Sequence, residues 1–189
     1  MASVETLASA ETETRSRTGP SGMWAFLATD AMGFGGLFVA YGFLRARAPS
    51  WPDPRGHLSL VGAAAMTFAL LASAFTVAEA SRAATPRART AWLAATLALG
   101  SAFLGGEIGE YARLWRAAVP VRLSDPYGAT FYLLTGYHGL HVAAGLVWLM
   151  AAAARGAPRR SVEVGSLYWQ FVDLAWTPIF TFLYLVPSR

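Results

Sequence analysis

The stretch Thr130–Met150, TFYLLTGYHGLHVAAGLVWLM, decides the fold class of this chain. A helix needs about 20 mostly apolar residues to cross the hydrocarbon core of a bilayer, and this run is long enough. It carries two histidines near its middle, His138 and His141. Ionisable side chains inside a bilayer are costly and by default mark a functional site. The stretch therefore predicts a transmembrane helix whose imidazoles have partners elsewhere in the chain.

The composition extends this prediction to the whole protein. Of 189 residues, 55% are hydrophobic and only 14% are charged, whereas soluble domains are about 45–50% apolar and about 25% charged. The apolar residues fall in long blocks, which indicates an integral membrane protein without a separate soluble domain. The absence of cysteine excludes disulfides, thiolate metal sites and c-type haem attachment. The net charge of +4 comes from arginines that flank the apolar blocks, so nucleic acid is not an expected partner.

The apolar blocks predict an all-α fold, a polytopic bundle of about five transmembrane helices. Residues 1–21 are polar, lack the apolar core of a signal peptide and are expected to form a flexible tail, whereas 22–189 form one transmembrane domain. The predicted spans are residues 23–44, 58–79, 90–115, 127–154 and 164–186. Pro178 is expected to kink the last of them.

Five spans place the two termini on opposite sides of the membrane. The arginines divide almost evenly, eight on the N-terminal side and seven on the other. The positive-inside rule therefore slightly favours a cytoplasmic N-terminus and an outside C-terminus.

Depth along the predicted helices sorts the intramembrane polar side chains into two layers, taking ~1.5 Å of rise per residue. The members are Asp30, His141 and Asp173 in one layer, with Gln170 one turn away, and Glu107, His138 and Glu110 in the other. Residues three apart share a helix face, so the two acids of the third span lie together, as do the two histidines. We expect these spans to pack face to face, with acids against imidazoles.

Three kinds of chemistry are open to such side chains. Di-iron bundles use Glu-x-x-His pairs on one helix, but here the acids and the histidines lie on different spans. A bis-histidine haem needs ligands from two sides, whereas His138 and His141 share a face and His57 lies in a loop. The spacing favours the third interpretation, in which buried polar pairs hold the bundle together and shape a lipid or proton path. No metal, cofactor or catalytic residue is therefore expected in this chain.

Four motifs follow one another along the chain: MWAFLATDAMGFGGLFVAY at 23–41, FLGGEIGEYARL at 103–114, LLTGYHGLHVAAG at 133–145 and YWQFVDLAW at 168–176. The third resembles the TGFHGLHV-type signature of subunit III of the haem–copper cytochrome oxidases, and the fourth resembles the YWHFVDxxW of its last helix. The first resembles the acid-bearing segment of that family, and the second resembles its third-from-last helix. The resemblance covers nearly the whole chain and matches the short, five-helix form of the family.

The resemblance implies a partner complex and a location. Subunit III binds no haem or copper itself; both are expected in the catalytic subunit I, which it joins together with subunit II. The family binds phospholipid in a cleft, supports proton uptake and protects the enzyme during turnover, and the cleft has been proposed as an oxygen path. A bacterial inner membrane with a cytoplasmic N-terminus is the implied setting.

The family's functional positions can be carried over residue by residue. By position they fall on Asp30, Glu110, His138, His141 and Asp173. Asp30 stands where the family usually has glutamate, and the side chain of aspartate is shorter by one methylene, so it does not reach as far as the family's acid. Gln170 stands where the family has histidine, and an amide does not titrate.

The sequence thus predicts a non-catalytic subunit III of a terminal oxidase that reduces oxygen and translocates protons. A subunit III-like component of a quinol oxidase or a nitric-oxide reductase is the nearest alternative. A small proton-coupled transporter that uses Asp30, His141 and Asp173 as a relay is a further alternative, although no inverted repeat supports it.

Overall fold

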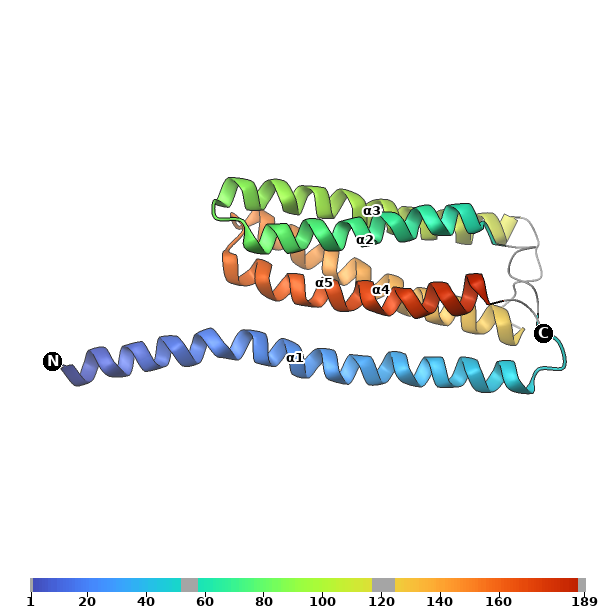
Figure 1. Ribbon diagram of the computed structural model, residues 1–189, viewed down its shortest axis with the longest axis horizontal. Helices are drawn as coiled ribbons and strands as arrows, with labels where there is room; N and C mark the ends of the chain where they lie inside the picture. Colours follow the sequence, from blue (N-terminus) through green and yellow to red (C-terminus); the bar gives the residue numbers. More distant parts are fainter. Residues whose placement is uncertain (1, 52–57, 117–124, 187–189) are drawn as a thin grey trace.

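The computed structural model describes residues 2–51, 58–116 and 125–186, with side chains from residue 21 onward. Its described part is all-α, as the apolar blocks predict. The elements are α1 (Ala2–Arg47), α2 (Leu60–Arg82), α3 (Pro86–Arg116), α4 (Pro126–Ala154), α5 (Arg159–Phe180) and a terminal π-helical turn, η2 (Thr181–Leu185). The helices lie side by side as an up-and-down bundle with the two chain ends at opposite ends of it (Figure 1).

Local sequence signals explain where the helices begin and end. Ser59 caps α2, because its hydroxyl accepts a hydrogen bond from the N–H of Gly62 at 3.1 Å. Pro126 opens α4 at the position where a missing N–H costs nothing. Helix α4 ends where Gly156 and Ala157 adopt left-handed backbone angles, with φ of 81° and 53°.

Helix α1 begins earlier than the sequence predicts. Residues 1–21 were expected to form a flexible tail, whereas the structure is helical from Ala2 and continues into the membrane segment without a break. The stretch contains three alanines and three glutamates, which favour a helix, but also four serines, four threonines and Gly19-Pro20, which do not, so helix propensity alone does not account for the difference. In Figure 1 this part of α1 projects beyond the ends of the other helices.

Four helices of the described part are long and apolar enough to cross a membrane: residues 21–47 of α1, and α2, α3 and α4. The fifth predicted span is α5, which lies in the bundle alongside them but is less apolar (Figure 1). Its sequence includes Glu163, Gln170 and Asp173. It is nevertheless well buried, with eleven of its 22 residues in the interior.

A tryptophan from α5 sits at the centre of the bundle. The indole of Trp169 is 1% exposed and lies between Gly100 of α3 and Gly145 of α4. A Cβ atom on either glycine would come within 2.6 Å or 2.8 Å of the ring, respectively. The Trp169 N–H donates to the hydroxyl of Ser73 on α2 at 2.8 Å. Four helices therefore meet at one side chain.

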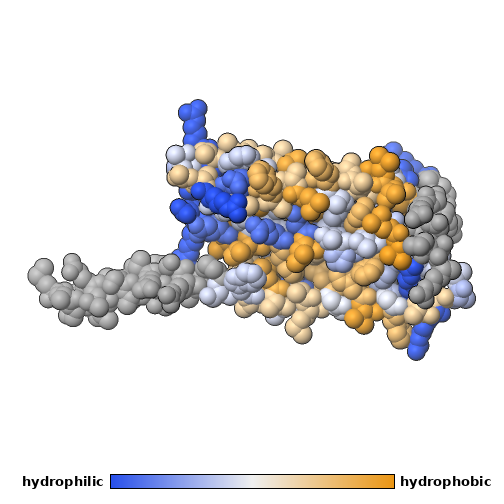
Figure 2. All heavy atoms as spheres, in the orientation of Figure 1, coloured by the Kyte–Doolittle hydropathy of each residue, from blue (hydrophilic) through white to orange (hydrophobic). Residues whose placement is uncertain are grey.

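Helix α1 lies at the edge of the bundle and packs chiefly against α4 and α5. Its buried stripe is narrow and consists of Leu27, Asp30, Phe34 and Tyr41. Most other side chains of its membrane segment are exposed, and they are mainly apolar. Figure 2 shows that the middle of the visible face is largely apolar while hydrophilic residues gather towards the ends, as a membrane protein requires.

Candidate intramembrane polar sites

The first polar site joins α1 to α4, and we call it the Asp30 site: Asp30, Tyr137 and His141. The Tyr137 hydroxyl donates to Oδ1 of Asp30 at 3.0 Å, and Nε2 of His141 lies 3.1 Å from the same oxygen. Asp30 is 8% exposed. Tyr137 and His141 are one helical turn apart on α4, so a single face of this helix presents both groups to the acid.

Counting protons at the Asp30 site gives its net charge. Nδ1 of His141 lies 2.7 Å from the carbonyl oxygen of Tyr137. A carbonyl only accepts, so Nδ1 carries a hydrogen. The contact between Nε2 and Asp30 needs a second proton, which resides on either the imidazole or the carboxyl. In both cases the charges of the pair sum to zero, which suits an apolar setting.

The second site, the Glu110 site, consists of Glu110, Ser59, Arg113 and Tyr184. Oε1 of Glu110 accepts from Arg113 at 3.1 Å and from the backbone N–H of Ser59 at 3.3 Å. Oε2 accepts from the Tyr184 hydroxyl at 2.7 Å. Three donors converge on one carboxyl group, and the Arg113 guanidinium forms an ion pair with it. It ties α3 to the start of α2 and to η2.

The neighbouring acid, Glu107, contacts a hydroxyl group rather than a guanidinium. The Thr135 hydroxyl donates to the carbonyl of Phe131 at 2.7 Å and lies 2.5 Å from the Tyr111 hydroxyl, which lies 3.1 Å from Oε1 of Glu107. Two hydroxyls supply only two protons for three contacts. All three contacts are hydrogen bonds only when Glu107 is protonated. Its other oxygen, Oε2, is buried against Gly139 without a hydrogen-bond partner.

His138 is fully buried between α3, α4 and α5. Nε2 lies 3.1 Å from the carbonyl oxygen of Val172 on α5, so this nitrogen carries the hydrogen and donates it. Nδ1 has no partner, which fits a neutral ring. The ring packs against Phe103 and Trp176, with centroid separations of 5.5 Å and 5.0 Å. Its role in the structure is packing and one bond to the backbone.

Gln170 and Asp173 are three residues apart on α5 but differ in exposure. Gln170 is exposed, and its amide donates to the Ser166 hydroxyl at 3.3 Å. Asp173 is 6% exposed, and its Oδ1 has no partner. It follows Trp169 by one turn and so lies on the side of α5 that faces α2, since Trp169 bonds to α2.

The structure therefore brings together only part of each predicted layer. Asp30 and His141 are joined, but Asp173 lies on the α2 side of α5 and is not bonded to them. Helices α3 and α4 do pack on each other, with Glu107 against α4 at Gly139. The expected acid–imidazole bond is nevertheless missing, because His138 reaches a backbone carbonyl of α5 instead. The predicted depths brought Asp30 and His141 to the same level, but the rotation of each helix about its axis determined which side chains form hydrogen bonds.

The sequence analysis singled out acids and histidines and missed three tyrosines that belong to these sites. Tyr111, Tyr137 and Tyr184 supply hydroxyls to all three acids described above. Two of them could have been found from spacing, because Tyr111 follows Glu107 by four residues and Tyr137 precedes His141 by four. Tyr184 is far from Glu110 in sequence, and only the fold brings them together.

Arg89 is a further group that the sequence places only near a loop. It is 7% exposed and donates to the carbonyl oxygens of Ala157 at 2.9 Å and Ala83 at 3.1 Å. These carbonyls follow the C-terminal ends of α4 and α2, where a positive charge is favourable. Arg89 thus ties two interhelical turns together at one end of the bundle.

Metal binding finds no support in the part of the chain that the structure describes. No group of three or more histidine, aspartate or glutamate side chains there is arranged to hold an ion. His57 lies outside the described residues. The polar sites contain at most one imidazole each, together with carboxyl, hydroxyl or backbone groups, and such sets suit hydrogen bonding between helices.

Comparisons with known proteins all identify the same subunit of terminal oxidases. A family model described as cytochrome c oxidase subunit III matches residues 2–188. A probable cytochrome c oxidase subunit 3 of Mycobacterium tuberculosis H37Rv is 36% identical over 177 residues, covering 87% of this chain and 86% of the relative. Cytochrome c oxidase subunit 3 of Thermostichus vulcanus is 31% identical, with 87% and 86% covered. Cytochrome bo(3) ubiquinol oxidase subunit 3 of Pseudomonas aeruginosa is 34% identical, with 87% and 83% covered.

Proposed function

Because this chain belongs to the cytochrome c oxidase subunit III family, we propose that it is the non-catalytic subunit of a haem–copper terminal oxidase, bound to subunits I and II in a bacterial inner membrane. Its work is to stabilise the catalytic subunit, to bind phospholipid and to support proton uptake and oxygen access. Haem and copper belong to the partner subunit, where oxygen is reduced.

The observation that carries this proposal is the charge balance of the buried sites. The Asp30 site is neutral as a pair, Glu107 and His138 are neutral by their hydrogen bonds, and the charge of Glu110 is met by Arg113 and two further donors. Each acid of these sites is fixed by tyrosine hydroxyls or by a neighbouring helix. Such groups hold helices in place, which suits a supporting subunit more than a relay that changes protonation at each turnover.

Two conservative substitutions test this balance. Glu110→Gln removes an ionised acceptor of three donors, and we expect lower thermal stability of the purified oxidase and faster loss of this subunit. Glu107→Gln replaces a neutral acid by a neutral amide of the same shape, so we expect little change. The two residues are three apart on α3, which makes each the control for the other. Equal effects of the two substitutions would contradict the assigned charge states.

The outer face of α5 is our candidate for the contact with the catalytic subunit. Gln170 is exposed there near the middle of the helix, and Leu174 and Thr177 continue the same exposed row. An amide that faces hydrocarbon without full hydrogen bonding is costly. A partner helix that offers a polar group would remove this cost. Gln170→Leu should therefore loosen the complex while leaving the bundle intact.

A quinol oxidase is the second candidate, and one comparison favours it. The similarity to a ubiquinol oxidase subunit of Pseudomonas aeruginosa is close to that of the cytochrome c oxidase relatives. A subunit III-like component of a nitric-oxide reductase is a third candidate of the same kind. A proton-coupled transporter is the candidate that the charge balance of the polar sites opposes.

Purification through a tag on this chain separates these possibilities. We expect a larger haem-containing subunit to co-purify in mild detergent, with a reduced-minus-oxidised spectrum that identifies its haems. Oxygen consumption with reduced cytochrome c or with a quinol then identifies the donor. A chain that purifies alone, colourless and free of metal would contradict the oxidase assignment and favour the transporter.

The membrane orientation can be tested with the same cysteine-free chain. Ala84 lies in the exposed turn between α2 and α3, and Ser50 is exposed near the opposite end of the bundle. Single cysteines at these positions should react differently with a membrane-impermeant maleimide in intact cells. A cytoplasmic N-terminus predicts that Ser50→Cys is labelled and Ala84→Cys is protected.

A further inference from the structure

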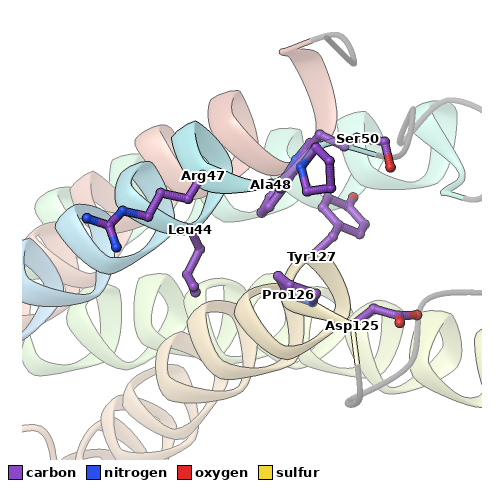
Figure 3. Close-up of a pocket in the computed structure, with 9 residues that line it drawn as sticks. Leu44, Arg47, Ala48, Ser50, Asp125, Pro126 and Tyr127 are labelled. Atoms are coloured by element: carbon purple, nitrogen blue, oxygen red, sulfur yellow. The ribbon is translucent and has the colours of Figure 1, made fainter.

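We draw no further inference here: the strongest candidate, the mostly apolar pocket between the end of α1 and the start of α4 (Figure 3), carries nothing because the Trp51 N–H in its wall is too buried for a ligand to reach and nothing in the described part of the chain shows what would fill it.

Discussion

Helices α5 and α1 are held to the same bundle by different means. Helix α5 buries half of its residues and places Trp169 between two glycines at the centre. Helix α1 buries only a narrow stripe within its membrane segment and reaches the bundle through polar side chains. Apolar burial drives neither contact, because lipid tails are as apolar as leucine. Close packing therefore holds α5 in the bundle, whereas hydrogen bonding holds α1.

The polar contacts of α1 occur at separate depths. Near one level Asp30 meets Tyr137 and His141 of α4. Further along, the Tyr41 hydroxyl donates to the carbonyl of Phe182 at 2.7 Å and accepts from Arg45 at 2.8 Å. Two fixed points along a helix set both its rotation and its height. The comparison therefore predicts large losses where packing fails and smaller, local losses where a single polar contact fails.

The largest effect is expected from Gly145→Ala, which tests the packing of α5. The new methyl group would lie within 2.8 Å of the Trp169 ring, and Gly100 closes the opposite side, so the ring has no room to move. Overpacking of this kind costs about 1–3 kcal/mol. We expect a lower thermal unfolding midpoint and faster loss of the subunit from the purified complex.

Gly35→Ala is the control for this substitution, because a Cβ atom there meets nothing within 4 Å. Both changes add one methyl group to a membrane helix, so any general effect of alanine on helix stability is shared. A Gly145→Ala complex as stable as the Gly35→Ala complex would contradict the close packing of Trp169.

Asp30→Ala tests the polar attachment of α1. The substitution leaves the Tyr137 hydroxyl and the His141 imidazole without their shared acceptor. We expect a loss of about 1–2 kcal/mol, with intact membrane insertion but a shorter turnover lifetime of the oxidase and weaker lipid retention. Stability is measured by thermal unfolding and lifetime by oxygen consumption until inactivation.

Thr29→Ala is the matched control, since the Thr29 hydroxyl donates only to the backbone of its own helix, to Phe26 at 2.7 Å. A double-mutant cycle of Asp30→Ala with His141→Ala isolates the bond between the two helices. A coupling energy near zero would show that α1 is held by packing after all, and the comparison with α5 would fail.

His138→Leu lies on the packed side of the molecule and is expected to have a smaller effect. Leucine fills much of the same space beside Phe103 and Trp176, and the lost contact is one bond to the Val172 carbonyl. We expect a loss of ~1 kcal/mol, measured as thermal stability of the complex. Unchanged stability would mean that the α4–α5 contact depends on shape alone.

The sequence predicted the helices well because its main signals are local. Apolar runs, Pro126 and the Ser59 cap fix where helices begin, and they were close to the observed bounds. Depth was also predictable, because helical rise is constant. Rotation was not, since it depends on which residues of a neighbouring helix are small. Gly100 and Gly145 admit Trp169, and this turns Asp173 towards α2, away from the Asp30 site.

The partners of the acids were hidden for a related reason. A tyrosine hydroxyl contacts one oxygen of each of three acids, Asp30, Glu107 and Glu110, whereas the sequence analysis looked for charged partners. Glu110 was expected to face the histidine helix, yet its partners are Tyr184, Arg113 and a backbone N–H at the start of α2. Arg89 was counted as a surface charge, but it is buried between two turns. The contacts of Glu110 and Arg89 do not follow a helical repeat, so a search for periodic patterns in the sequence does not find them.

Tyr41→Phe is expected to have the smallest effect and gives the sharpest test of the polar attachment. Tyr41 is 4% exposed and packs against Trp51 and Phe182 by its ring, which phenylalanine keeps. Only the hydroxyl is lost, and with it the bonds to the Phe182 carbonyl and from Arg45. Interhelical hydrogen bonds in membranes are worth ~0.6 kcal/mol on average. A loss of that size, added to the loss from Asp30→Ala in the double variant, would mean that α1 is held at two independent points. A loss above about 2 kcal/mol would mean that Tyr41, Trp51 and Phe182 are fixed as one unit.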